Sequence, residues 1–243
     1  MKTNVKNILL NGAMACVVAM AGGNALAAEA KPNPITAIDI LLEPDATMIE
    51  HATATNERLL KVFPKGFALD ASHRPHITLV QRFVLTENLD KVYAAVGKVF
   101  ASANVTGLKL EAFKYYYIPD KDLGVSGIVI KPTPELLTLE KQVIDAVTPF
   151  AVKTGTSAAF VTTPEDPNII PPLIAYVSEF VPKHSGENYH PHVTTGLAPR
   201  EYLDKMLTEP FEAFTFSPVG VAVYHLGHFG TAAKELKEWD LKP

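Results

Sequence analysis

The pattern of apolar and polar positions predicts that strands and helices alternate along this chain. Segments rich in β-branched and aliphatic residues, some of them alternating with polar positions, are typical of strands. Such segments lie at 35–42, 76–84, 108–118, 125–130, 192–196, 211–216 and 219–225, and the segment 152–163 also favours a strand. Helices are predicted where capping residues and proline or glycine positions bound longer segments. These lie at 45–62, 86–102, 132–148, 173–181 and 200–207.

The residues between these segments favour an α+β fold. Asp45 is a helix N-cap residue, and Pro64 and Gly66 follow the end of the same helix. The turn at 119–124 joins two predicted strands into a hairpin-like pair. Hairpins mixed with helices favour largely antiparallel sheets over a doubly wound parallel sheet. An apolar content of 47% in 243 residues supports a packed core and excludes a disordered chain.

Residues 1–27 carry the pattern of a secretory signal peptide. Lys2 and Lys6 precede an apolar run that contains no acidic residue. The small residues of the sequence ALAAEA end this run and provide a cleavage site, which we place after Ala27. Cleavage there leaves a single domain at 28–243, and the protein is expected to be periplasmic or secreted.

A retained membrane anchor and a lipid anchor are the alternatives for this segment. Glycine and asparagine residues interrupt the apolar run, whereas a span needs about 20 apolar residues. Cys16 lacks the leucine that is usual three residues before a lipidated cysteine, because Ala13 stands there. We therefore expect a mature chain with no membrane span and, since Cys16 is the single cysteine, with no thiol chemistry.

The charge balance argues against a long nucleic-acid interface. Lys and Arg number 22 and Asp and Glu 26, which gives a net charge of -4. Removal of Lys2 and Lys6 with the signal peptide changes this to -6. A negatively charged chain is poorly suited to coating a run of phosphates.

Two short segments share one pattern. The sequences RPHITL at 74–79 and HPHVTT at 190–195 both read Pro-His-aliphatic-Thr in a predicted strand. Each is followed by a Leu-Asp-Lys-aliphatic string, at 89–92 and 203–206. A third His-x-Thr, at 51–53, has no proline and falls in a predicted helix, so we interpret it as coincidence. The two matched segments indicate an internal duplication.

The spacing within each motif places its two polar side chains together. Residues i and i+2 of a strand project to the same face, so His76 lies beside Thr78, and His192 beside Thr194. If a pseudo-twofold axis relates the two halves, all four side chains converge on one cleft. One imidazole can then accept a proton while the other donates one, and the hydroxyls can bind anionic oxygens. A phosphodiester suits this arrangement, which requires neither a metal nor another cofactor.

The paired motifs resemble those of the 2H phosphoesterase superfamily, which includes 2′-5′ RNA ligase-like proteins and cyclic nucleotide phosphodiesterases. The resemblance implies a bilobal α+β fold with two antiparallel sheets around a central cleft and helices on the outside. It implies metal-independent cleavage, or reverse ligation, of 2′,3′-cyclic or 2′-5′ phosphodiesters. On this resemblance His76 and His192 are the general acid and base, in an order that the sequence leaves open. Thr78 and Thr194 would bind phosphate oxygens.

Six further residues are candidates for substrate contact. Aromatic side chains on strands can stack on a nucleobase, although most such residues pack within the protein. Arginine can bind phosphate, and histidines near the motifs can lie at the rim of a cleft. The candidates are Tyr115, Tyr117, Arg82, His73, His190 and His225.

Two other functions are compatible with the same residues. His73, His76, His190 and His192 could bind zinc or copper, although a metal does not explain the threonines. A non-catalytic module could keep the cleft to bind a phosphoester. The acidic chain nevertheless favours an enzyme that takes a small phosphodiester or short oligonucleotide, and we expect a monomer.

Overall fold

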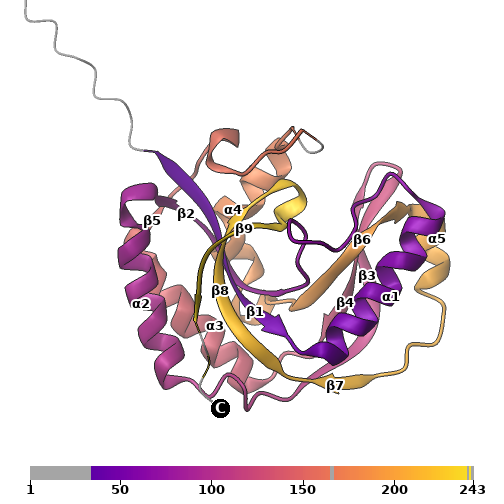
Figure 1. Cartoon of the computed structure of the whole chain (residues 1–243), viewed down its shortest axis with the longest axis horizontal. Helices are drawn as coiled ribbons and strands as arrows, with labels where there is room; N and C mark the ends of the chain where they lie inside the picture. The colour runs from indigo at the N-terminus through magenta and orange to yellow at the C-terminus, as the bar shows by residue number, and fades with distance from the viewer. Residues whose placement is uncertain (1–33, 165–166, 240, 242–243) are drawn as a thin grey trace, which may run out of the picture. The chain divides into compact units, whose positions relative to one another are not determined.

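A computed structural model of the protein describes residues 34–164, 167–239 and 241 (Figure 1). The predicted signal peptide, including Cys16, lies outside the described residues. Within the described part of the chain, no helix is long and apolar enough to cross a bilayer. The described residues form two antiparallel sheets with helices, which confirms the predicted α+β class.

The two sheets each carry one of the two motifs. The first sheet contains β1 (Ile35–Pro44), β2 (Ile77–Leu85), β5 (Ala151–Val152), β8 (Pro218–Leu226) and β9 (Ala232–Trp239). The second contains β3 (Leu110–Asp120), β4 (Leu123–Ile130), β6 (His192–Pro199) and β7 (Phe214–Phe216). Their strand orders are β5-β2-β1-β8-β9 and β6-β4-β3-β7. The motif strands β2 and β6 therefore lie next to the end and at the end of their sheets.

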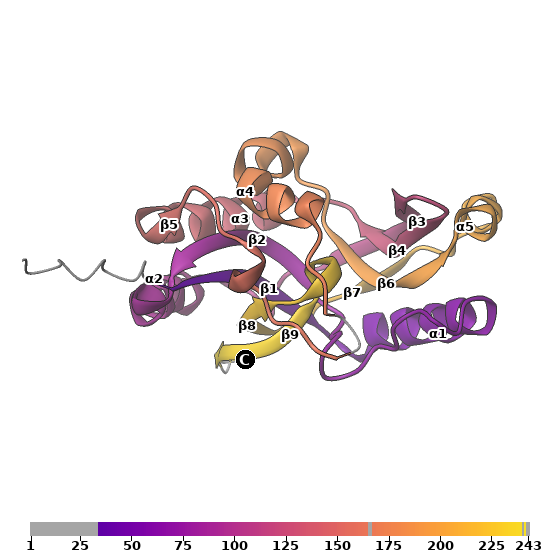
Figure 2. The ribbon, with the colours of Figure 1, turned by 90° about the horizontal axis from the view of Figure 1, so that it is seen from above.

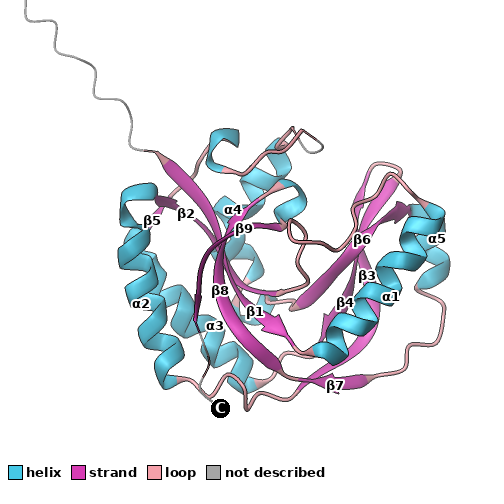
Figure 3. Ribbon diagram, viewed as in Figure 1, coloured by secondary structure: helices cyan, strands magenta, loops and turns pink. Residues whose placement is uncertain are grey.

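The helices begin where the sequence supplies caps. They are α1 (Ala46–Val62), α2 (Leu89–Ser102), α3 (Pro134–Val147), α4 (Pro171–His184) and α5 (Arg200–Met206). The Asp45 side chain accepts hydrogen bonds from the first amides of α1, as predicted, and Thr133 caps α3. Helices α3 and α4 pack against β2, whereas α1 and α5 pack against the second sheet (Figure 2, Figure 3).

One apolar core joins the two sheets. Ile40 of β1 and Leu79 of β2 belong to the same buried cluster as Ile128 of β4 and Val193 of β6. Truncating a buried side chain of this kind to alanine typically costs about 2–5 kcal/mol. Because this core spans both sheets, it holds the two motif strands at a fixed separation.

The duplicated sequence pattern corresponds to a repeated order of elements. Strand β2 leads through a short 3-10 turn into α2, and β6 leads directly into α5. The two Leu-Asp-Lys strings lie in these helices, at 89–92 and 203–206. Each motif strand is thus followed by a helix that begins or ends with the same string.

Some predicted strand limits are wrong. The segment 152–163 is not a strand beyond β5, because the chain leaves the sheet edge and Phe160 packs edge-on against Phe83 at 5.6 Å. Strand β7 is shorter than predicted, because Phe211 turns away to pack on Tyr115. The sequence pattern does not predict strand β9 (Ala232–Trp239). Two irregularities in its pairing with β8 disrupt the two-residue period that identifies a strand in sequence.

Candidate active site

The four motif side chains lie on the wall of one cavity of about 350 Å³. Thr78 lies on β2 of the first sheet and His76 immediately precedes that strand, whereas His192 and Thr194 lie on β6 of the second sheet. The shared core between the sheets brings these two pairs together on one cavity, which is the convergence expected if a pseudo-twofold axis relates the two halves. The cavity is therefore the candidate active site.

His76 is held by a carbonyl on one side and a carboxylate on the other. Its Nδ1 donates to the backbone carbonyl of Arg74 at 2.7 Å, which leaves Nε2 as the nitrogen available for proton exchange. Nε2 lies 3.5 Å from Oδ2 of Asp39. Burial alone would lower the pKa of His76, but the hydrogen bond and charge of Asp39 outweigh it, and the pKa is raised above 6.5.

Asp39 is a fully buried carboxylate beneath the first motif. Its Oδ2 accepts hydrogen bonds from Thr78 Oγ1 at 2.7 Å and from Gln81 Nε2 at 2.9 Å. Its Oδ1 has no hydrogen-bond partner among the described residues. A buried charge needs such partners, so Asp39, His76, Thr78 and Gln81 form one polar group within the apolar core.

Sequence reasoning missed Asp39, although a signal for it exists. Asp39 is the single charged residue in the apolar strand sequence ITAIDILL. Burying an unpaired carboxylate is costly, so an acidic residue within a buried strand indicates a polar partner elsewhere in the fold. The sequence does not show which partner that is.

His192 has the same local geometry but the opposite electrostatic environment. Its Nδ1 donates to the His190 carbonyl at 2.8 Å, matching the contact between His76 and Arg74. The edge of the Tyr116 ring packs against it at 4.8 Å between centroids. Burial, together with the charges of the neighbouring histidines, lowers the pKa of His192 to about 4. The pKa values of the two imidazoles are therefore shifted in opposite directions, that of His76 upward and that of His192 downward.

Tyr189 links the two motif strands directly. The residue is 7% exposed, and its hydroxyl donates to the backbone carbonyl of Thr78 at 2.6 Å. Tyr189 stands three residues before His192, so this bond ties the entry to the second motif to the first motif strand. The bond supplements the apolar core in fixing the cavity.

The two tyrosines that were candidates for stacking on a nucleobase, Tyr115 and Tyr117, face away from the cavity. Tyr115 packs against Phe211 at 4.7 Å, and Tyr117 donates to Asp204 of α5 at 2.5 Å. Neither lines the cavity, because α5 and the segment before β7 cover that face of β3. Tyr116, between them on the strand, points to the other face and contacts His192.

The other predicted contacts also lie outside the set of residues that line the cavity. His73 bonds Asp70 at 3.0 Å, and His225 bonds the Ala159 carbonyl at 2.8 Å. Arg82 is half-buried, with its Nε unpartnered among the described residues. His190 lies nearer, in a small adjacent cavity that it shares with Thr78 and His192.

The four histidines considered as metal ligands do not assemble into one site. His73 belongs to a separate surface pocket, while the His190 and His192 ring centroids are 6.1 Å apart. Among the described residues, no group of three or more His, Cys, Asp or Glu side chains is placed to hold a metal ion.

Comparison with known proteins gives likeness of fold only. No family model matches the sequence, and no curated protein matches it. Solved structures similar to the chain include Escherichia coli LigT complexed with ATP, at 13% identity and a TM-score of 0.39, covering 86% of this chain and 99% of LigT. TT0787 of Thermus thermophilus is similar at 16% identity and a TM-score of 0.47, covering 85% and 98% of the two chains. Kluyveromyces marxianus Usb1 with uridine monophosphate is similar at 10% identity and a TM-score of 0.42, again covering 85% and 98%.

The chain's own architecture defines its class of fold. Two antiparallel sheets each present one His-x-Thr motif to a common cavity, which is the arrangement that the resemblance of the motifs to the 2H phosphoesterases implies. Because these solved structures share only 10–16% of their residues with this chain, its function is inferred from its own residues.

Glu140 of α3 is a buried carboxyl group beside the segment that leads into the second motif. It is 1% exposed, and its Oε2 accepts a hydrogen bond from the Gly186 amide at 3.1 Å. Burial raises the pKa of Glu140 to about 7, although the bond from Gly186 acts in the opposite direction. Glu140 therefore titrates near neutral pH in the folded protein.

The stability of the protein is expected to fall as Glu140 ionises. Between its unfolded pKa of about 4.5 and its folded pKa of about 7, the folded state holds a proton that the unfolded state has lost. The free energy of unfolding should therefore decrease as pH rises across this window, by about 3 kcal/mol more in the wild type than in Glu140→Gln. Urea unfolding of both proteins on either side of the window measures this, and parallel pH profiles would contradict it.

Proposed function

We propose that the protein is an exported, metal-independent phosphodiesterase that acts on a 2′,3′-cyclic or 2′-5′ phosphodiester of a small nucleotide or short oligonucleotide. One observation carries the proposal: both His-x-Thr pairs, 116 positions apart in sequence, line a single cavity. Two histidines that served only in core packing would not be expected to line the same cavity, each with a threonine two residues later.

The different environments of the two histidines support a division of labour. His192, with its lowered pKa, is neutral and acts as the general base that takes a proton from the attacking water. The water oxygen forms a bond to phosphorus while the bond from phosphorus to the leaving oxygen breaks. His76, whose protonated form is stabilised by Asp39, gives its proton to that leaving oxygen. Each turnover thus moves one proton onto His192 and one off His76, and solvent exchange restores both.

The two threonines are not equivalent in this scheme. Thr78 Oγ1 donates its proton to Asp39, so in this arrangement it cannot also donate to a phosphate oxygen. Thr194 lines the cavity beside His192 and is the hydroxyl that we assign to the phosphate. Thr78 instead stabilises the carboxylate that positions His76.

The dependence of kcat/KM on pH is expected to be bell-shaped with widely separated limbs. Activity should fall as pH drops through the His192 pKa of about 4, because the base becomes protonated. Activity should also fall as pH rises through the raised pKa of His76, above 6.5, because the acid is lost. A rate profile from about pH 3 to 9 tests this, and an acid limb above pH 6 would contradict the role of His192 as base.

A panel of cyclic and linear phosphodiesters, assayed with EDTA present, tests the function itself. Turnover by the wild type and its loss in His192→Ala support a metal-independent enzyme. Activity abolished by EDTA, with stoichiometric zinc in the purified protein, would favour the metal-binding alternative. Tight binding of a cyclic phosphate with no turnover would identify a non-catalytic module.

We also propose that the protein acts outside the cytoplasm, because of the signal-peptide pattern of residues 1–27. Expression of the full chain, followed by N-terminal sequencing of the exported product, tests this proposal. A mature protein that begins at Ala28 is expected. A chain that keeps Met1 and stays in the cytoplasm would overturn it.

A further inference from the structure

The wall of the active-site cavity is largely apolar. Apart from the motif residues, most of its surface comes from aliphatic and aromatic side chains of β3, β4, α4 with the residue before it, and the loop between β8 and β9. They include Ile118, Val125, Ile170, Leu173, Tyr176 and Phe229. Pockets of this composition bind apolar groups and use a few polar side chains to orient the reacting part of the ligand.

The same wall lacks fixed positive charge. Of the described residues that line the cavity, none is Lys or Arg, and the one carboxylate is Asp120 at the end of β3. A positive charge on His76 is already paired with Asp39 at 3.5 Å, so this wall can accept at most the one negative charge of a phosphodiester. A terminal phosphate would bring up to two further negative charges, which this wall cannot pair and which Asp120 would repel.

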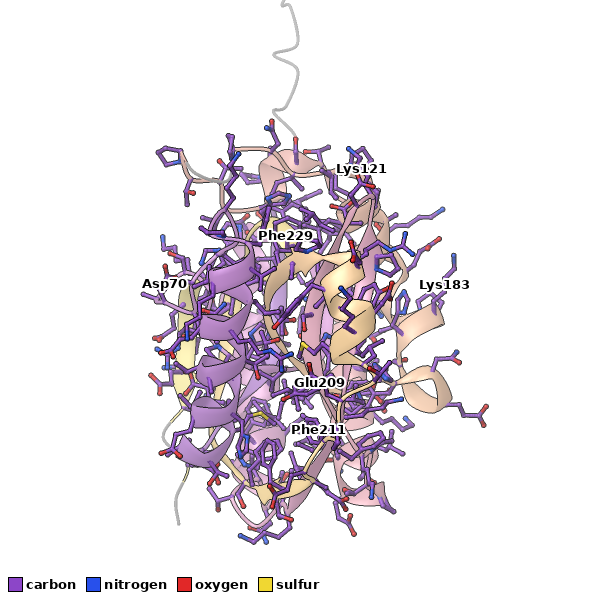
Figure 4. The ribbon with its side chains drawn as sticks, turned by 90° about the vertical axis from the view of Figure 1, so that its right-hand side faces the viewer. Asp70, Lys121, Lys183, Glu209, Phe211 and Phe229 are labelled. Atoms are coloured by element: carbon purple, nitrogen blue, oxygen red, sulfur yellow. The ribbon has the colours of Figure 1, made fainter. Side chains whose placement is uncertain are left out.

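Phe229 occupies an unusual backbone position at this wall. It lies in the loop between β8 and β9, with a φ of 57°, in the left-handed region that aromatic residues rarely adopt (Figure 4). Its ring stacks on His228 at 3.9 Å between centroids and lies 6.2 Å from the ring of Phe67. Strained positions that keep a bulky residue are concentrated at ligand sites, and here the residue is one that lines the cavity.

We propose that the substrate carries its only negative charge on the reacting phosphodiester, together with an uncharged apolar or aromatic group that contacts Phe229. This inference rests on the phosphodiesterase function proposed above and specifies its substrate class. It excludes diesters that also bear a terminal phosphate. A cyclic nucleoside phosphate with a free 5′-hydroxyl has the required chemistry.

Three probes separate the two parts of the proposal. Adenosine 2′,3′-cyclic monophosphate carries one charge and a base, its 5′-phosphorylated form adds charge, and methyl riboside 2′,3′-cyclic phosphate lacks the base. We expect kcat/KM to fall at least about tenfold on adding the 5′-phosphate and about tenfold on removing the base. All three carry the same reacting group, so differences report only on the rest of the cavity.

Matched variants assign each loss to its residue. Asp120→Asn should recover several-fold of the rate on the 5′-phosphorylated probe, whereas Asp122→Asn, in the same turn but not lining the cavity, should not. Phe229→Ala should slow adenosine 2′,3′-cyclic monophosphate by about tenfold while leaving the base-free probe nearly unchanged. Phe229→Leu, which keeps an apolar side chain, should fall between the two, and thermal unfolding confirms that each variant folds.

The outcomes distinguish this inference from the function on which it rests. Equal kcat/KM for the three probes would overturn the substrate class and leave the phosphodiesterase function standing. If the wild type cleaves none of the three probes nor any other diester, the proposed function fails, and this inference fails with it. Loss of rate in Phe229→Ala on the base-free probe as well would overturn the assignment of Phe229.

Discussion

Replacing either His76 or His192 by alanine is expected to lower kcat/KM at least about a hundredfold, the lower limit for loss of a general acid or base. Both side chains line the same cavity, and an alanine at either position leaves no imidazole there to transfer the proton. The double variant should be little worse than either single variant, because acid and base act in one step. Steady-state rates on a cyclic phosphodiester with EDTA present provide the measurement.

His51→Ala is the matched control for these variants. His51 belongs to the third His-x-Thr sequence, but it lies on α1 and stacks on Phe214 at 3.7 Å, outside the set of residues that line the cavity. Its replacement should leave the rate unchanged. Wild-type rates in both His76→Ala and His192→Ala would exclude the two-histidine mechanism.

Replacing Asp39 by asparagine is expected to move the alkaline limb of the pH profile to lower pH. The carboxylate is 0% exposed and keeps a positive charge on His76, and asparagine preserves its shape while removing that charge. Each unit by which the His76 pKa falls should lower the rate on the alkaline side about tenfold, with little change on the plateau below it. A structural role alone would lower the rate at every pH, so full profiles separate the two.

Asp70→Asn is the control for Asp39→Asn. Asp70 also pairs with a histidine, His73, at 3.0 Å, but the pair lies in a separate surface pocket. Its replacement should not move either limb. An unchanged alkaline limb in Asp39→Asn would show that Asp39 does not control the protonation of His76.

The fold class and the four motif residues could be predicted from the sequence because their signals are local. Strand spacing puts His76 beside Thr78 and His192 beside Thr194 whatever the rest of the fold does. Helix caps such as Asp45 depend on adjacent amides. The repeated motif then indicates that the two pairs work together.

The residues around the motifs could not be predicted, because their roles depend on which face of a strand is covered. Tyr115 and Tyr117 flank Tyr116 on β3 and project from the opposite face of the strand. That face is covered by α5 and Phe211. The sequence contains three adjacent tyrosines, and only the packing of α5 and Phe211 determines which one contacts His192.

The sequence by itself determined that two histidines and two threonines would be presented in matched pairs from an α+β fold. Only the tertiary structure decided that the pairs differ. Asp39, 37 positions before His76 in sequence, lies beneath the first motif, while the second motif has the Tyr116 ring and no carboxylate among the residues described around it. The physical reason is that a pKa depends on all the charges and apolar atoms around a group, and long-range packing supplies these.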